Sequence, residues 1–121
     1  MAALTATPLA ASTPHMAFMS ANDAAMSKMM AGMDIKPSGD VDRDFVNMMI
    51  PHHQGGIDMA VAELRYGKNE QLRRLAQEII VAQQQEIAAM RLAIGQPPPP
   101  PSASPTTPIP HGPTSSHHEE R

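Results

Sequence analysis

Residues 48–59 of the chain read Met48-Met49-Ile50-Pro51-His52-His53-Gln54-Gly55-Gly56-Ile57-Asp58-Met59. The flanking pattern demands a helix here, yet a proline inside a helix costs about 3 kcal/mol and each glycine about 1 kcal/mol relative to alanine. The local penalty, on the order of 5 kcal/mol, rivals the whole stability of a small domain. Sequences that break local rules usually do so at functional sites. This break surrounds two adjacent histidines flanked by three methionines, which are ligands for a soft or borderline metal ion.

The helix that contains this stretch is expected over residues 41–66, with Asp40 or Asp42 as its N-cap and Gly67 as its stop. At 3.6 residues per turn, both histidines fall on a wide apolar side of this helix. Pro51 falls on the opposite side, which we expect to face solvent. A proline there would bend the helix around the core.

Two further helical patterns flank the central one. The first is expected over residues 18–33, where Met19, Met26, Met30 and Met33 recur at spacings of seven, four and three. The second is expected over residues 70–93, with Asn69 as its cap. The sequence therefore predicts an all-α, antiparallel three-helix domain of the bundle type.

The connection between the second and third helices is short, so these helices should be antiparallel neighbours. Counting outward from this turn places Gln83 and Ile87 near His52 and His53, and Met90 near Met49. Gln83 is the single polar residue in the apolar stripe of the third helix. We expect it to orient a histidine ring.

The composition shifts at both ends of the chain. Residues 1–14 are small and uncharged, and we expect a disordered leader or the remnant of a signal peptide. Residues 15–95 form the expected Met- and His-rich metal-binding domain. Residues 96–121 open with five consecutive prolines and predict a disordered tail rich in Pro and His. The tail is either an inert polar segment or a weak metal collector; its histidines are His111, His117 and His118.

Charge and composition exclude several functions. The formal net charge of −3 gives no basic footprint for nucleic acid, and no apolar run approaches the length of a membrane span. The chain has no cysteine, which excludes disulfides, thiolate metal sites and cysteine nucleophiles. Di-iron chemistry needs Glu-x-x-His pairs, but Met49 and Ile50 stand three residues before the two histidines. We therefore expect a protein that is not an enzyme.

The conjunction of histidine and methionine favours a metal site. A methionine stripe alone indicates core packing, and a lone histidine on an apolar side is usually buried and hydrogen-bonded. Two buried imidazoles would cost about 1–3 kcal/mol for each unsatisfied polar group, and a metal ion would remove that cost. Thioethers select Cu(I) or Ag(I), whereas imidazole also accepts Cu(II) and Zn(II). The candidate ligands are His52, His53, Met48, Met49, Met59 and Met90, with Met26, Met30 and Met33 from the first helix.

The run GDVDRDFVNMMIPHHQGGIDMAVAELRYGKNEQLRRLAQEIIVAQQQEIAAM, residues 39–90, resembles a bacterial family known as domain of unknown function 305. The most specific parts are D-F-V-x-x-M-I-P-H-H-Q-G, I-D-M-A and A-Q-Q-x-E-I-x-x-M. The resemblance implies a secreted protein with a ferritin-like antiparallel helical fold, similar to CopM-like proteins that bind copper through Met and His. Carried over by position, it points to Met49, His52, His53, Met59 and Met90.

The expected function is therefore copper binding for extracytoplasmic sequestration, transfer or tolerance, in the periplasm or in secreted form. Many members of this family place a Met-His pair on the first helix where this chain has Met29-Met30, so the resemblance implies a more purely thioether site that favours Cu(I). Copper-donor or copper-acceptor proteins are the expected partners. Because three short helices make a thin core, a homodimer is a further expectation. The alternative is a non-catalytic helical interaction module whose methionines line a groove for a partner.

Overall fold

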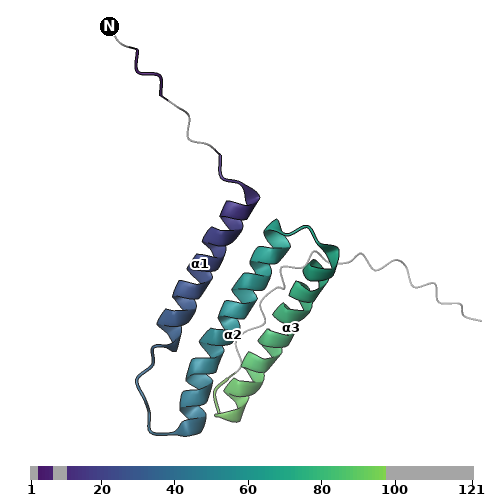
Figure 1. Ribbon diagram of the computed structural model, residues 1–121. Coiled ribbons are helices and arrows are strands. Elements are labelled where there is room, and N and C mark those ends of the chain that lie inside the picture. The colour runs from purple at the N-terminus through teal and green to yellow at the C-terminus, as the bar shows by residue number, and fades with distance from the viewer. Residues whose placement is uncertain (1–2, 7–10, 98–121) are drawn as a thin grey trace, which may run out of the picture.

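The structure, a computed structural model, describes residues 3–6 and 11–97. Its elements are α1 (Pro14–Met33), α2 (Val41–Tyr66) and α3 (Glu70–Ala93), and the described residues contain no strand. The three helices run antiparallel to their neighbours and lie side by side, with α2 in the middle (Figure 1). The expected all-α, antiparallel three-helix fold is confirmed. The expected leader lies partly, and the expected tail almost wholly, outside the described residues.

The first helix begins earlier than the sequence analysis expected. Thr13 is its N-cap, since its hydroxyl accepts a hydrogen bond from the Met16 backbone N–H at 3.1 Å. Pro14 occupies the first helical turn, where a missing N–H costs nothing. The expected start at Phe18 was therefore wrong by one turn, because it followed the methionine spacing and overlooked the Thr-Pro pair.

The central helix begins and ends where its capping residues predicted. The Asp40 carboxylate accepts hydrogen bonds from the backbone N–H groups of Asp42 and Arg43, at 3.0 and 3.2 Å. Of the two candidate N-caps, Asp40 is the one used. At the other end, the Gly67 N–H donates to the Glu63 carbonyl. The helix passes through Pro51 without interruption.

The turn between α2 and α3 is stabilised by the side chain of Arg73. The Nη1 atom of Arg73 donates hydrogen bonds to the carbonyl oxygens of Leu64 and Gly67, at 2.5 and 3.2 Å. These are carbonyls at the end of α2, which otherwise lack partners within the helix. Asn69 caps α3 by accepting from the Leu72 N–H. The two helices are thus fixed as antiparallel neighbours, as the short connection predicted.

The core lies between α2 and α3 and is small. Ile80 is its only side chain that is wholly buried among the described residues. Its buried members come from both helices, and half-buried apolar residues, Met90 among them, pack against it. The buried residues of this cluster are Ile57, Ala60, Ala76, Ile80 and Ile87.

The contact between α1 and α2 is made by small residues. A Cβ atom placed on Gly32 of α1 would lie 2.8 Å from the Cβ of Pro51, and one placed on Gly55 of α2 would lie 2.9 Å from the Met29 sulfur. Pro51 is therefore half-buried against α1, and the expectation that it faces solvent was wrong. The reason is that α2 packs against a helix on each side. The side that meets α1 is marked in the sequence by glycines rather than by large apolar residues.

The arrangement is an open layer of helices. Within the described part of the chain, α1 and α3 each pack against α2 and do not contact one another. Within the described residues, no further helix therefore covers either broad side of α2. None of the helices described has the length and apolar character needed to cross a membrane.

Candidate metal centre

The two adjacent histidines point to different surroundings. Their ring centroids are 6.3 Å apart and their planes are inclined by 61°. The His53 side chain is 13% exposed and reaches toward α3, whereas His52 is exposed. The expectation that both imidazoles are buried in an apolar environment was therefore wrong for His52. Since the His52 ring is exposed, the free-energy cost of burying an unpaired imidazole does not explain why this histidine is present.

His53 is held through both of its ring nitrogens. Its Nδ1 lies 2.9 Å from the Met49 carbonyl oxygen, one turn earlier in α2, and its Nε2 contacts a carboxylate oxygen of Glu86 in α3. The expectation that Gln83 orients a histidine ring was wrong, because Glu86 takes that place. Glu86 lies one helical turn beyond Gln83 in α3. Counting residues outward from the α2–α3 turn placed Gln83 and Ile87 near the histidines, and the same counting could have placed Glu86 there.

The contacts between α1 and α2 establish which residues share a face. Pro51, Gln54, Gly55 and Asp58 meet Lys28, Met29 and Gly32 on one side of the seam between α1 and α2. Glu63 and Tyr66 meet His15 and Phe18 on the other side. We counted along each helix from these contacts at 3.6 residues per turn. This count places six candidate ligands on the same side of the seam as His15, Phe18, Glu63 and Tyr66. We call this set the thioether face: Met26, Met30, Met33, Met48, His52 and Met59.

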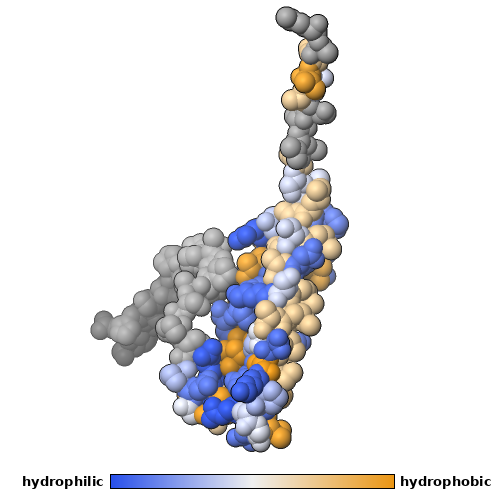
Figure 2. Space-filling model, turned by 90° about the vertical axis from the view of Figure 1, so that its left-hand side faces the viewer, coloured by the Kyte–Doolittle hydropathy of each residue, from blue (hydrophilic) through white to orange (hydrophobic). Residues whose placement is uncertain are grey.

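Most methionines of the thioether face are exposed. Met26, Met48 and Met59 are each more than 40% exposed, and Met30 is 62% exposed. Met48 and His52 are one helical turn apart on α2, the spacing at which side chains are neighbours. Figure 2 shows the side of the molecule formed by α1, where hydrophobic residues lie at the surface among hydrophilic ones. The thioether face thus presents soft donors and one open imidazole to solvent.

The remaining three candidate ligands lie on the α3 side of α2. Met90 packs against the core and is half-buried, as is Met49. His53 is occupied by the contacts described above. The structure therefore divides the nine candidates into the thioether face and this second set, which consists of Met49, His53 and Met90.

The described residues do not include three or more His, Cys, Asp or Glu side chains close enough together to hold a metal ion. A metal ion bound to this part of the chain needs donors of another kind. Methionine sulfur and the amide oxygen of glutamine are the donors available beside the two histidines. Sulfur favours Cu(I), and amide oxygen favours harder ions.

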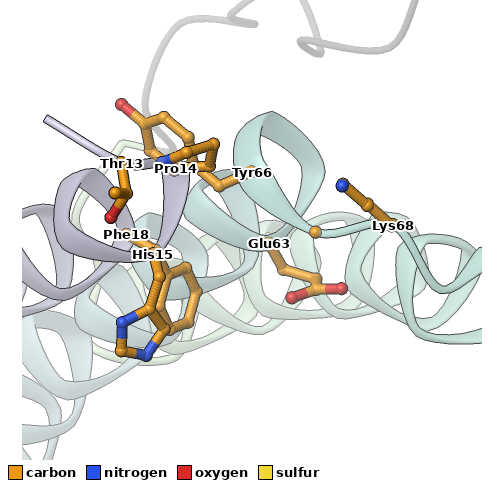
Figure 3. Close-up of a pocket in the computed structure, with 8 residues that line it drawn as sticks. Thr13, Pro14, His15, Phe18, Glu63, Tyr66 and Lys68 are labelled. Carbon is orange, nitrogen blue, oxygen red and sulfur yellow. The ribbon is translucent and has the colours of Figure 1, made fainter. Parts of the chain in front are cut away.

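A pocket of about 410 Å³ lies apart from the candidate ligands, between the start of α1 and the end of α2. Figure 3 shows Tyr66 beside Pro14, with His15 and Phe18 projecting from α1 and Glu63 from α2. None of the nine candidate ligands lines this pocket. It is an open pocket with mixed apolar and polar walls, and its His15 was not among the residues singled out from the sequence.

The Asp44 carboxylate stabilises the start of α2. Asp44 accepts hydrogen bonds from the Ser38 hydroxyl at 2.6 Å and from the Ser38 backbone N–H at 3.0 and 3.1 Å. These bonds favour the ionised form and hold the pKa of Asp44 below its usual value of 3.8. Asp44 therefore serves the fold and takes no part in the candidate metal centre.

The chain belongs to the family described as domain of unknown function (DUF305), which it matches over residues 3–94. The match spans all three helices and both sets of candidate ligands. It confirms the resemblance seen in residues 39–90. The search of curated proteins found no match to the chain.

Proposed function

We propose that this protein binds copper, with Cu(I) preferred over Cu(II) and Ag(I) as a chemical substitute, and that the thioether face holds the ion. What supports the proposal is the helical spacing of α1 and α2, which puts five methionines and His52 on one side of these two packed helices. Thioether sulfur is a ligand for soft ions, and an exposed imidazole can supply nitrogen to the same ion. The role is sequestration or transfer outside the cytoplasm, without covalent chemistry by the protein.

The exposure of the methionines on the thioether face supports binding over packing. A methionine that only fills a core is buried, as expected for an adaptable apolar side chain. Met48 and Met59 are each 42% exposed on either side of His52. An ion can reach these donors from solvent and leave again, which is what delivery to a copper-acceptor protein requires.

The direct test is Cu(I) binding in competition with a chromophoric Cu(I) chelator under reducing conditions. The test variant carries Met48→Leu, His52→Ala and Met59→Leu. Its matched control is Met16→Leu, since Met16 is also exposed but points away from α2. We expect the triple variant to lose at least about tenfold in affinity while the control keeps it. Equal affinity in all three proteins would contradict the proposal.

The second candidate function is that of a helical interaction module. The observation that favours it is that further large apolar side chains, Phe45 of α2 and Leu72 and Leu75 of α3, are about half exposed. Exposed apolar patches often mark docking sites for proteins. Under this alternative the triple variant would bind Cu(I) as well as the wild type does, and the two functions are thereby distinguished.

A further inference from the structure

We propose that the segment Pro108-Ile109-Pro110 docks in the apolar groove between α2 and α3 of its own chain, where it covers Leu72 and Leu75. The segment then fills a groove that would otherwise be open to a protein partner. This contact needs no metal ion and therefore goes beyond the proposed function.

The groove is open and is lined mainly by apolar side chains. It has a volume of about 220 Å³ and lies between Met59 of α2 and Leu72, Leu75 and Ile79 of α3. Leu72 is 52% exposed and Leu75 is 48% exposed, so about half of each side chain remains in contact with water. Removal of such apolar surface from water favours the docking of an apolar ligand.

The end of α3 turns the chain off the helix axis. Gly95 has a φ of 75°, in the left-handed region, and its N–H donates to the Leu92 carbonyl at 3.1 Å. The Gln96 N–H donates to the Arg91 carbonyl at 2.8 Å, which completes the pair of hydrogen bonds typical of a helix that stops at glycine. Gln96 is half-buried beside the last turn of α3. The segment that follows therefore starts beside α3 and does not continue its axis.

The sequence beyond α3 has the composition of a groove-binding ligand. Residues 97–101 are all proline, and further prolines follow up to residue 113. Proline restricts the backbone, so a proline-rich segment loses little conformational entropy when it binds an apolar groove. Ile109 is the only large apolar residue of the sequence 98–121, and it stands between Pro108 and Pro110. It is therefore the one side chain there that suits an apolar groove.

The length of the segment matches the position of the groove. The stretch of α3 from Ala93 back to Leu72 is about 32 Å long at 1.5 Å per residue. A polyproline chain from Gln96 to Ile109 covers about 40 Å at 3.1 Å per residue. The excess of about 8 Å allows for the step from the end of α3 to the groove beside it. Ile109 thus reaches the groove, which lies near the opposite end of α3 (Figure 1).

The covalent link favours this segment over a second copy of the chain. A ligand joined to α3 by a short proline-rich connection has a high effective concentration at the groove, whereas the same segment of another chain must first associate. Docking within one chain is therefore independent of protein concentration, which a contact between two copies is not.

The test is paramagnetic relaxation measured by methyl NMR on the full chain. The chain has no cysteine, so Thr107→Cys provides a single position for a nitroxide label next to the proposed ligand. We expect the label to cause loss of the Leu72 and Leu75 methyl signals. The Leu92 methyl signals are the internal control, because Leu92 is exposed on α3 but does not line the groove. They should persist, although Leu92 lies closer to the label along the chain.

Two variants of the labelled chain separate docking from mere proximity. Ile109→Asp should restore the Leu72 and Leu75 signals, because a carboxylate is not stable in an apolar groove. Ser104→Asp is the matched control, since it adds the same charge to the same segment without changing the ligand, and the signals should stay lost. None of these changes alters a candidate copper ligand, so this test and the Cu(I) competition fail separately.

Three outcomes would overturn the proposal. The first is a loss of signal that is greatest at Leu92, which would place the segment near the end of α3 and outside the groove. The second is an equal loss at Leu72 and Leu75 with and without Ile109→Asp. The third is loss of these signals when isotope-labelled chains without nitroxide are mixed with nitroxide-labelled chains, which would show that the groove holds the segment of a second copy.

Discussion

Gly32 in α1 lies directly against the ring of Pro51 in α2: a Cβ atom on Gly32 would be 2.8 Å from the Pro51 Cβ and 3.2 Å from its Cγ. The missing side chain lets α1 approach α2 beside the histidine pair. The position of the α1 methionines relative to His52 therefore depends on a glycine in one helix and a proline in the other.

Gly32→Ala should destabilise the fold. Alanine favours a helix over glycine by about 1 kcal/mol, but the proline ring cannot rotate away, and overpacking costs about 1–3 kcal/mol. Gly56→Ala is the matched control, because its added Cβ would meet only the Gln83 amide at 3.6 Å or more. We expect the control to be neutral or more stable in urea unfolding. Greater stability of Gly32→Ala than of the control would contradict this packing.

Ser38→Ala should raise the pKa of Asp44 toward 3.8, because it removes the hydroxyl that favours the ionised carboxylate. The folded-state pKa is lowered, so the contact stabilises the fold above about pH 4 and is lost as pH falls through that lowered pKa. Titration of the Asp44 side-chain carboxyl ¹³C resonance in both proteins measures the shift. An identical midpoint in wild type and variant would show that the hydroxyl has no such effect.

Replacing Met26, Met30 and Met33 together by leucine should preserve the fold and lower the capacity for Cu(I). Leucine has nearly the same volume and helix preference as methionine but lacks a donor sulfur. Equilibrium dialysis under reducing conditions gives the number of ions bound, and circular dichroism gives the helix content. Met16→Leu serves as the control. An unchanged capacity for Cu(I) in the triple variant would show that these methionines serve packing and do not bind the ion.

Cu(I) affinity should fall on acidification, and the fall should depend on His52. A protonated imidazole cannot bind a metal ion, whereas a thioether carries no proton that competes with the ion. The wild type should bind Cu(I) less tightly as the solution is made acidic, while His52→Ala should bind less tightly than the wild type and nearly independently of pH. Parallel pH profiles in the two proteins would exclude His52 as a ligand.

The helices could be predicted from the sequence where local chemistry determines them. Asp40, Gly67 and Asn69 mark ends of α2 and α3 because each satisfies backbone groups that a helix leaves unpaired. The start of α1 could have been found in the same way, from Thr13 and Pro14. The methionine spacing gave a later start because it reports one face of a helix rather than its ends.

The surroundings of each candidate ligand could be predicted less well. Apolar periodicity on α2 identified the face toward α3 but not the face toward α1, where Gly32, Pro51 and Gly55 make the contact. Small residues leave no hydrophobic signal in a single helix. The wide apolar side of α2 was therefore expected to be buried throughout, although His52 is exposed. Glu86 was missed as the partner of His53 because it lies outside the apolar stripe of α3.

In the proposed function, methionine sulfur and His52 hold a soft ion on one face of α1 and α2. Anomalous scattering from a crystal soaked in Ag(I) or Cu(I) tests it most directly. We predict an anomalous peak within bonding distance of the His52 ring and of sulfur atoms of the thioether face. A peak that lies only on nitrogen and oxygen donors between α2 and α3, with none on these methionines, would contradict the claim.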